Sequence, residues 1–243
     1  MAILTDKQIE AMSKEQYIVL ISGKKRAGKD TFAEVLLRVM MEQGINAGTN
    51  TRGNARFALA TPIKSMIEAL NPVVAYMPKR RYQEVVADWG YEKAKDKFPD
   101  IRVMMQGMAD AVKTVDPDFF SRHLVSTMWK FFTDRGRIAF VTDMRFQAEE
   151  DYIRACAEVA GVPVVHIRVK ESRHRGRPPV VCHHNSECWE PEVFDAKVTN
   201  DKALGMEGFA IKTLPALKVI AQIVERFDYE EPPISVGKVE TGV

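Results

Sequence analysis

Nine consecutive residues near the N-terminus, Gly23 to Thr31, have the types and spacing that phosphate binding requires. They fit the pattern G-x-x-x-x-G-K-[ST], except that Asp30 stands where Ser or Thr is expected. Glycines allow the backbone to approach an anion closely, and N–H groups at a helix N-terminus attract it. Lys29 can reach the β- and γ-phosphates of a nucleoside triphosphate as a mobile cation. The residues expected to hold the triphosphate are Gly23, Lys25, Arg26, Ala27, Gly28, Lys29, Asp30 and Thr31.

The departure at Asp30 leaves two interpretations open. The hydroxyl normally found here ligates Mg²⁺, and a carboxylate could replace it because Mg²⁺ prefers oxygen ligands and keeps several waters. Thr31, the next residue, could supply the hydroxyl instead. Alternatively, Asp30 caps the N-terminus of the helix that follows. We favour a metal-side role for Asp30 and Thr31.

The loop stands between a predicted strand and a predicted helix. Residues 17–22 form a short apolar run typical of a buried parallel strand, and residues 31–42 place apolar side chains at helical spacing. Strand and helix patterns continue to alternate, which predicts an α/β fold with a mainly parallel sheet. Further strands are predicted at 55–60, 137–142, 162–169 and 196–199, and further helices at 61–70, 79–97, 101–115, 119–132, 147–160 and 206–227.

Composition narrows the class of protein. The 243 residues are 46% hydrophobic and 28% charged, and the net charge is only +2, so no overall signature of nucleic-acid binding is present. Three cysteines argue against a disulfide framework. Residues 1–16 are polar and lack an apolar signal core, and no apolar run reaches the length of a membrane span. We expect a cytoplasmic enzyme with no stable nucleic-acid partner and no membrane association.

A second group of reactive side chains follows the strand predicted at 137–142. Asp143 and Arg145 stand at its carboxyl end, the edge at which open α/β sheets bind ligands. We expect Asp143 near Mg²⁺ or a substrate hydroxyl, and Arg145 on a phosphate. Glu149 lies four residues later, near the start of the next helix. The alternative is a salt-bridge group at a strand–helix junction.

Cations on two predicted helices suit a second anion. Lys64 lies in the first turn of its helix, where a cation is unfavourable unless an anion is near. Arg102 and Gln106 are four residues apart and therefore share one helix face. The alternative for all three is an ordinary solvated surface residue.

Residues 170–191 are rich in Arg, His and Pro and are long for a connecting loop. An arginine-rich loop can close over phosphates and neutralise charge that develops during transfer, a role expected for Arg173 and Arg175. The alternative is a flexible basic surface loop. A zinc site in this segment lacks a C-x2-C pair, and a Cys–His nucleophile lacks an oxyanion site. The residues concerned are Cys182, His183, His184 and Cys188.

Taken in order, these motifs resemble those of the bacteriophage-type deoxynucleoside monophosphate kinases. The resemblance extends from about residue 17 to residue 224. It is carried by Gly28-Lys29-Asp30-Thr31, Pro62-Ile63-Lys64, Arg102 to Gln106, the group Asp143, Arg145 and Glu149, then His184-Asn185-Ser186-Glu187, and Asn200-Asp201.

The resemblance implies a P-loop NTPase fold of three α/β/α layers with a mainly parallel sheet. The implied kinase domain spans 17–229, between an N-terminal extension at 1–16 and a flexible tail at 230–243. It includes a helical insert at about 71–134 and an Arg-rich lid at about 170–191. The implied reaction transfers the γ-phosphoryl of ATP, with Mg²⁺, to a deoxynucleoside monophosphate.

The resemblance also implies roles for individual residues. The aromatic residue expected downstream falls at Phe119 or Phe120, of which we take Phe120. Implied on the monophosphate side are Lys64, Arg102, Gln106, Phe120, Asp143, Arg145 and Glu149. Expected in catalysis are Lys29, Asp30, Arg145, Arg173 and Arg175.

Several alternatives stay open at this point. One is a P-loop kinase for another small phosphate such as phosphomevalonate, and another is a nucleotide-dependent DNA-associated factor. A homodimer formed through 79–97 also stays open. If the chain is phage-encoded, the expected location is the cytoplasm of the host cell.

Overall fold

The computed structural model of the protein describes residues 3–24, 27–45, 56–172, 189, 191 and 193–227. The chain divides into two compact units. Unit 1 comprises residues 1–57 and 128–243 and holds the large sheet, whereas unit 2 comprises residues 58–127 and is built mainly of helices.

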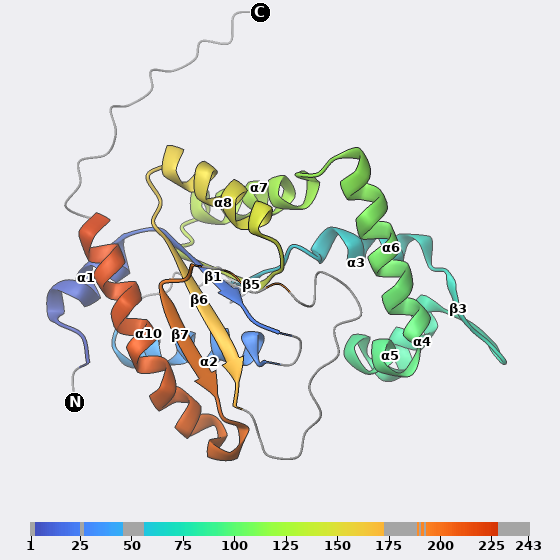
Figure 1. The fold of residues 1–243 in the computed structure, drawn as a ribbon, viewed down its shortest axis with the longest axis horizontal. Helices are drawn as coiled ribbons and strands as arrows, with labels where there is room; N and C mark the ends of the chain where they lie inside the picture. The colour runs from blue at the N-terminus through green and yellow to red at the C-terminus, as the bar shows by residue number, and fades with distance from the viewer. Residues whose placement is uncertain are drawn as a thin grey trace, which may run out of the picture. The chain divides into compact units, whose positions relative to one another are not determined.

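Unit 1 is built on a five-stranded parallel sheet with the strand order β2-β5-β1-β6-β7 (Figure 1). Every residue of β1 is buried, because this strand lies at the centre of the sheet. The strands are β1 (Tyr17–Ser22), β2 (Arg56–Phe57), β5 (Ile138–Met144), β6 (Val164–Glu171) and β7 (Ala196–Asn200).

The strand order explains the layers around the sheet. The connection from β1 to β2 passes β5 in one direction, and the connection from β5 to β6 passes β1 in the other. Because parallel crossovers are right-handed, α2 (Lys29–Glu42) and α8 (Gln147–Val159) must cover opposite faces, as Figure 1 shows. α10 (Gly205–Phe227) packs against α2 and β7. The predicted three-layer α/β/α fold with a parallel sheet is therefore confirmed.

The N-terminal residues contribute a helix to unit 1, α1 (Asp6–Lys14), which packs against α10. A capping box begins it: the Thr5 hydroxyl accepts from the Gln8 N–H, and the Gln8 side chain accepts from the Thr5 N–H. Ala11 and Met12 are buried. Residues 1–16 were expected to be only a polar N-terminal extension, and this helix was not predicted.

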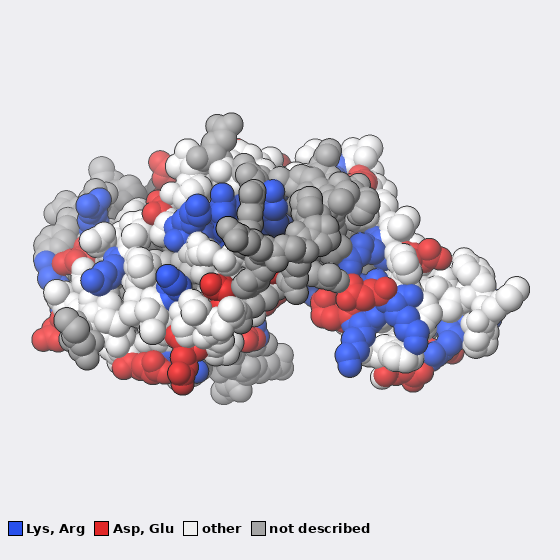
Figure 2. Space-filling view, turned by 60° about the horizontal axis from the view of Figure 1, so that its bottom comes forward, with Lys and Arg blue, Asp and Glu red and all other residues white. Residues whose placement is uncertain are grey.

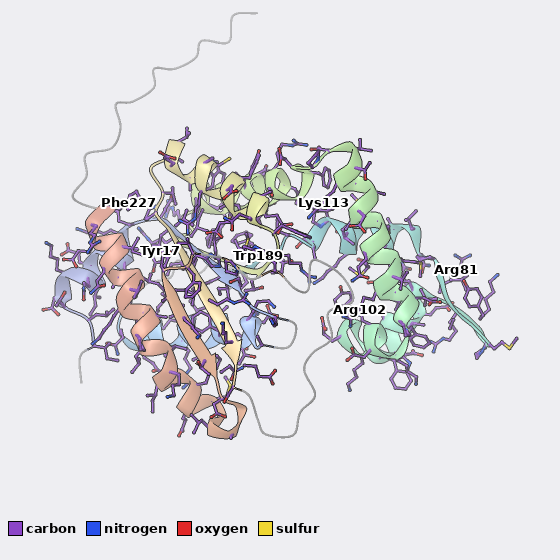
Figure 3. The ribbon with its side chains drawn as sticks, in the orientation of Figure 1. Tyr17, Arg81, Arg102, Lys113, Trp189 and Phe227 are labelled. Atoms are coloured by element: carbon purple, nitrogen blue, oxygen red, sulfur yellow. The ribbon has the colours of Figure 1, made fainter. Side chains whose placement is uncertain are left out.

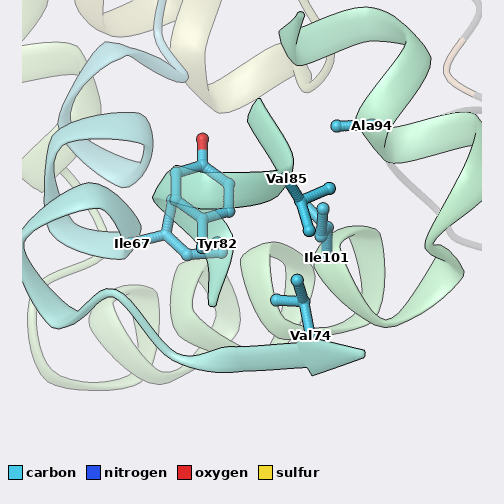
Figure 4. Close-up of a cluster of buried hydrophobic side chains, with 6 residues drawn as sticks. All are labelled: Ile67, Val74, Tyr82, Val85, Ala94 and Ile101. Carbon is cyan, nitrogen blue, oxygen red and sulfur yellow. The ribbon is translucent and has the colours of Figure 1, made fainter. Parts of the chain in front are cut away.

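Unit 2 has its own hydrophobic core, formed by Ile67, Val74, Tyr82, Val85, Ala94 and Ile101 (Figure 4). Three methionines of α6 pack against this cluster, Met104, Met105 and Met108. The elements are α3 (Thr61–Leu70), β3 (Val73–Tyr76), β4 (Lys79–Arg81), α4 (Tyr82–Trp89), α5 (Tyr91–Lys97) and α6 (Pro99–Val115). Helix α7 (Phe119–Thr133) contributes residues to both units.

Two predicted elements are wrong in extent or type. The strand predicted at 55–60 shrinks to Arg56–Phe57, because the chain turns at 59–60 into α3. The helix predicted at 79–97 is instead the strand β4 followed by two short helices. Gly90, with φ 72°, separates these helices, since it takes a backbone conformation that a helix interior does not allow.

None of the helices in the described part of the chain combines the length and the apolar composition needed to cross a membrane.

Candidate active site

The glycine-rich loop leaves the carboxyl end of β1 and leads into α2. In the sheet, Ser22 is in register with Met144 at the end of β5 and with Arg168 of β6. The loop and the ends of both neighbouring strands therefore meet at one edge, where open α/β sheets bind ligands. Lys25 and Arg26 lie outside the described residues.

Two glycines let the loop lie directly against β6 and β7. Gly28, the N-cap of α2, has φ 88°, and a Cβ added there would lie 2.2 Å from Asn200 Nδ2. A Cβ added at Gly23 would lie 2.6 Å from the Val169 carbonyl oxygen. Both distances are too short for a side chain, so the loop can hold this position only with glycine at these places.

Asn200, the last residue of β7, also holds the loop through a hydrogen bond. Its side chain is buried, and Nδ2 donates a hydrogen bond of 3.0 Å to the Ala27 carbonyl. The Ala27 carbonyl would repel a phosphate if it turned toward the anion. The hydrogen bond from Asn200 holds this carbonyl in another direction and so leaves the loop able to bind an anion. From the sequence, Asn200 was expected only as part of the motif Asn200-Asp201, without a role of its own. Its signal is a polar residue ending a buried strand.

The side chain of Lys29 folds back over the loop. Its Nζ donates to the carbonyl oxygens of Gly23 at 2.9 Å and Lys24 at 3.3 Å. Burial, together with the positive charge of Arg145, lowers the pKa of Lys29 to about 8, although Asp30 raises it. A charged Lys29 is therefore held in surroundings that favour an added anion.

This pKa leads to a prediction about proton uptake. Because the triphosphate favours the charged form, its binding raises the pKa of Lys29 above the value of about 8 in the free protein. At pH 8 about half of the free molecules must gain a proton when nucleotide binds. The affinity for the nucleotide should therefore fall as the pH rises above 8, by up to about tenfold for each pH unit. Calorimetric titration in buffers of different ionisation enthalpy measures the uptake, and equal heats at pH 8 would contradict it.

Asp30 contacts the end of β5 rather than capping a helix. Its Oδ1 accepts a hydrogen bond of 2.8 Å from the Thr142 hydroxyl. The N-cap of α2 is Gly28, without a side-chain cap, so the capping interpretation is wrong. Thr31 follows in the first turn and is half-buried.

The oxygen donors at this edge suit Mg²⁺ only in part. Among the described residues, no group of three or more His, Cys, Asp or Glu side chains could hold a metal. Mg²⁺ commonly uses one or two protein oxygens, completed by phosphate oxygens and water. Asp30 and Thr31 fit such an arrangement, and they would hold the ion together with the bound nucleotide.

Asp143, Arg145 and Glu149, predicted near the end of β5, make two different kinds of contact. Asp143 is half-buried within the strand and Arg145 is exposed just after it, and both act electrostatically on Lys29. Glu149 is buried, and its Oε2 accepts hydrogen bonds from the N–H groups of Arg145 at 3.1 Å and Phe146 at 3.2 Å. Glu149 thus closes the strand–helix junction, and its contact with a substrate stays a prediction.

A buried polar network, which was not predicted from the sequence, begins at Ser22 just before the loop. His166 of β6 is fully buried, with Nε2 2.8 Å from Ser22 Oγ and Nδ1 3.0 Å from Glu150 Oε2, the latter not in hydrogen-bond geometry. Arg154 Nε donates to Glu150 Oε1 at 2.8 Å. Burial acts to raise the pKa of Glu150, but His166 and Arg154 outweigh it and lower the pKa.

The sequence does carry a signal for this network. His166 and Arg168 alternate with the apolar residues Val165, Ile167 and Val169, and so point to the same face of the strand. Arg168 is also buried, and its Nη1 lies 3.4 Å from the Trp189 carbonyl oxygen, while the His166 ring stacks on Trp189 (labelled in Figure 3).

Four predicted substrate residues belong to unit 2. Lys64 of α3 is half-buried, as are Arg102 and Gln106 on α6. Phe120 is 3% exposed and meets Phe119 edge to face, with ring centroids 5.3 Å apart. Their contact with a substrate stays a prediction. The predicted lid residues Arg173 and Arg175, together with Cys182, His183, His184 and Cys188, lie outside the described residues.

No protein-family model and no curated protein matches the sequence. Among solved structures, the chain is similar to the Mycobacterium tuberculosis APS kinase CysC in a cysteine-to-alanine mutant. That match has a TM-score of 0.43 and 15% identity, and covers 84% of this chain and 98% of that one. The complex of the same kinase with AMPPNP and APS gives 0.44 and 16%, over 83% and 98%.

Proposed function

We propose that the protein is an ATP-dependent kinase that phosphorylates deoxynucleoside monophosphates to diphosphates. The observation that carries the proposal is Lys29, a half-buried cation held on a glycine-rich loop at the carboxyl edge of a parallel sheet. Asp143 and Arg145 act on it from the next strand. This arrangement supports binding of a polyphosphate chain and transfer of its terminal group.

The described residues supply positioning and charge rather than a covalent intermediate. Loop N–H groups and Lys29 hold the β- and γ-phosphates, and Asn200 keeps the Ala27 carbonyl away from them. Arg145 neutralises charge on the transferring group or on the acceptor phosphate. No strong general base is required, because a monophosphate acceptor is already anionic.

Asp30 and Thr31 would hold Mg²⁺, which would neutralise negative charge on the phosphates of the nucleotide. We expect Asp30→Asn to raise the Mg²⁺ concentration for half-maximal turnover about 10- to 100-fold, the effect of losing one charge-assisted contact. The amide oxygen can still accept from Thr142, so the fold should persist. Glu34→Gln is the matched control, since Glu34 is an exposed acid of α2 that pairs with Arg56 at 2.8 Å. An unchanged Mg²⁺ dependence in Asp30→Asn would move the metal-side role to Thr31.

A substrate panel tests the acceptor class. ADP formation from ATP should be measured with each of the four deoxynucleoside monophosphates, the matching ribonucleotides, and non-nucleotide phosphates including phosphomevalonate. The proposal expects the deoxynucleotides to give the highest kcat/KM. Turnover confined to a non-nucleotide phosphate would keep the kinase chemistry and reject the acceptor.

A DNA-associated factor is the alternative from another class. On the face drawn in Figure 2, described Lys and Arg side chains lie among Asp and Glu side chains, in keeping with the net charge of +2. A mixed surface of this kind gives weak attraction to a polyanion. Tight DNA binding with a steep salt dependence, and no phosphorylation of any monophosphate, would favour this alternative.

A further inference from the structure

Two lysines of unit 2 share one aromatic ring. Lys95 Nζ of α5 lies 4.1 Å from the ring centroid of Tyr91, and Lys64 Nζ of α3 lies 4.7 Å from the same centroid. Such contacts stabilise a cation at its aromatic partner. The ring of Tyr91 therefore contacts two ammonium groups that come from different helices.

A third cation reaches the same region from α6. Arg102, labelled in Figure 3, has Nη2 3.3 Å from Asp96 Oδ1 of α5. Burial lowers the pKa of Lys95, and the charges of Arg102 and Lys64 lower it further, whereas the pairing with Glu92 raises it. Arg102 and Lys64 therefore both repel the charge of Lys95 within unit 2.

The carboxylates that pair with these cations are the more exposed partners. Glu92, 2.9 Å from Lys95, has 80% of its side chain exposed against 18% for Lys95. Asp96 is 58% exposed against 29% for Arg102. Exposed pairs of this kind contribute little stability, so an incoming anion can displace both acids. The cations, held closer to the core, would stay in place.

We propose that Lys95 is a binding residue for the acceptor phosphate, together with Lys64 and Arg102, and that Tyr91 fixes the spacing of the two lysines. The ligand class is a phosphomonoester dianion. Its two negative charges would be concentrated on one group that all three cations can contact, whereas Glu92 and Asp96 each pair with one cation. This inference rests on the proposed function for its substrate, but the site itself requires only an anion. Lys95 could not be recognised from the sequence, because the two cations that it joins, Lys64 and Arg102, belong to other helices.

Kinetics of single variants provide the first test. Lys95→Met keeps most of the side-chain stem and removes the charge, and it should raise KM for the monophosphate about 10- to 100-fold while KM for ATP stays unchanged. Lys95→Arg should restore part of the loss because it restores the charge. Lys93→Met is the matched control on the exposed side of α5 and should behave as wild type. Equal monophosphate KM values in Lys95→Met and Lys93→Met would overturn the inference.

Phosphate binding separates this inference from the proposed function. The full chain carrying Lys29→Ala, which lacks the loop lysine, is titrated with inorganic phosphate and followed by nuclear magnetic resonance. Adding Lys95→Met should weaken phosphate binding about 10- to 100-fold, whereas adding Lys93→Met should not. If phosphate does not bind, or if Lys95→Met leaves its affinity unchanged, the inference is overturned. Lys95-dependent binding in a protein that phosphorylates no monophosphate would support the anion site and reject the proposed reaction.

Discussion

Replacing Lys29 with methionine is expected to lower turnover by about three orders of magnitude, because preorganised charge at the transferring phosphate is lost. The same change should raise the unfolding temperature of the nucleotide-free protein. Burial and Arg145 lower the pKa of Lys29 to about 8. The charged side chain therefore costs stability below that pH, and methionine removes the charge while it keeps much of the packing.

The pH dependence of this effect has a defined sign. Lys29 has a pKa of about 8 when folded against its ordinary value of 10.5, so the unfolded chain binds more protons between these values. The wild-type protein thus becomes more stable as the pH rises from about 8 to 10.5. The difference in unfolding temperature between Lys29→Met and the wild type should shrink over the same range. Calorimetry at pH 7 and near pH 10 measures the difference, with Lys212→Met on the exposed face of α10 as control. Near-normal turnover in Lys29→Met would reject the kinase assignment.

Replacing Gly28 with alanine should lower kcat/KM for ATP about 100-fold, the cost of displacing reacting groups by about an ångström. The added Cβ would lie 2.2 Å from Asn200 Nδ2, and φ of 88° disfavours any side chain by about 1–2 kcal/mol. The loop must then move away from β7. The variant Gly44→Ala separates the steric conflict from the backbone strain. Gly44 has a similar φ of 82°, but nothing lies within 4 Å of its Cβ position.

A double-mutant cycle tests the contact with Asn200 directly. Asn200→Ala alone loses the bond to the Ala27 carbonyl, worth about 1 kcal/mol, and should weaken nucleotide binding about fivefold. Combined with Gly28→Ala, it removes the steric conflict, so the double variant should bind ATP better than Gly28→Ala alone. Strictly additive losses, or equal ATP affinity in Gly28→Ala and Gly44→Ala, would show that Asn200 does not position the loop.

Local patterns predicted most of unit 1 but not the hairpin of unit 2. Buried parallel strands are runs of apolar residues, so Tyr17–Ser22 and its neighbours could be recognised one at a time. The strand Lys79–Arg81 is short and wholly charged, and it pairs with Val73–Tyr76 through backbone hydrogen bonds. A three-residue strand offers too few positions for an alternating pattern to emerge.

In the candidate site, too, residues of continuous motifs could be predicted, whereas contacts between distant parts of the chain could not. Lys29 and Asp30 belong to one continuous motif, and Asp143 and Arg145 follow a recognisable strand, so short-range reasoning found them. Asn200 contacts Ala27 across 173 residues of chain, and only the folded sheet brings the two together.

The anchoring of the glycine-rich loop bears on when its shape is formed. Gly23 is pressed against β6, and Ala27 is tied to β7. These described parts of the cradle are therefore set by tertiary packing as the chain folds, rather than by the arriving nucleotide. Ordering a loop on binding would take free energy from the affinity, and a prearranged cradle avoids much of that loss. The sheet thus contributes to nucleotide recognition without touching the ligand, because it bears the conformational cost beforehand.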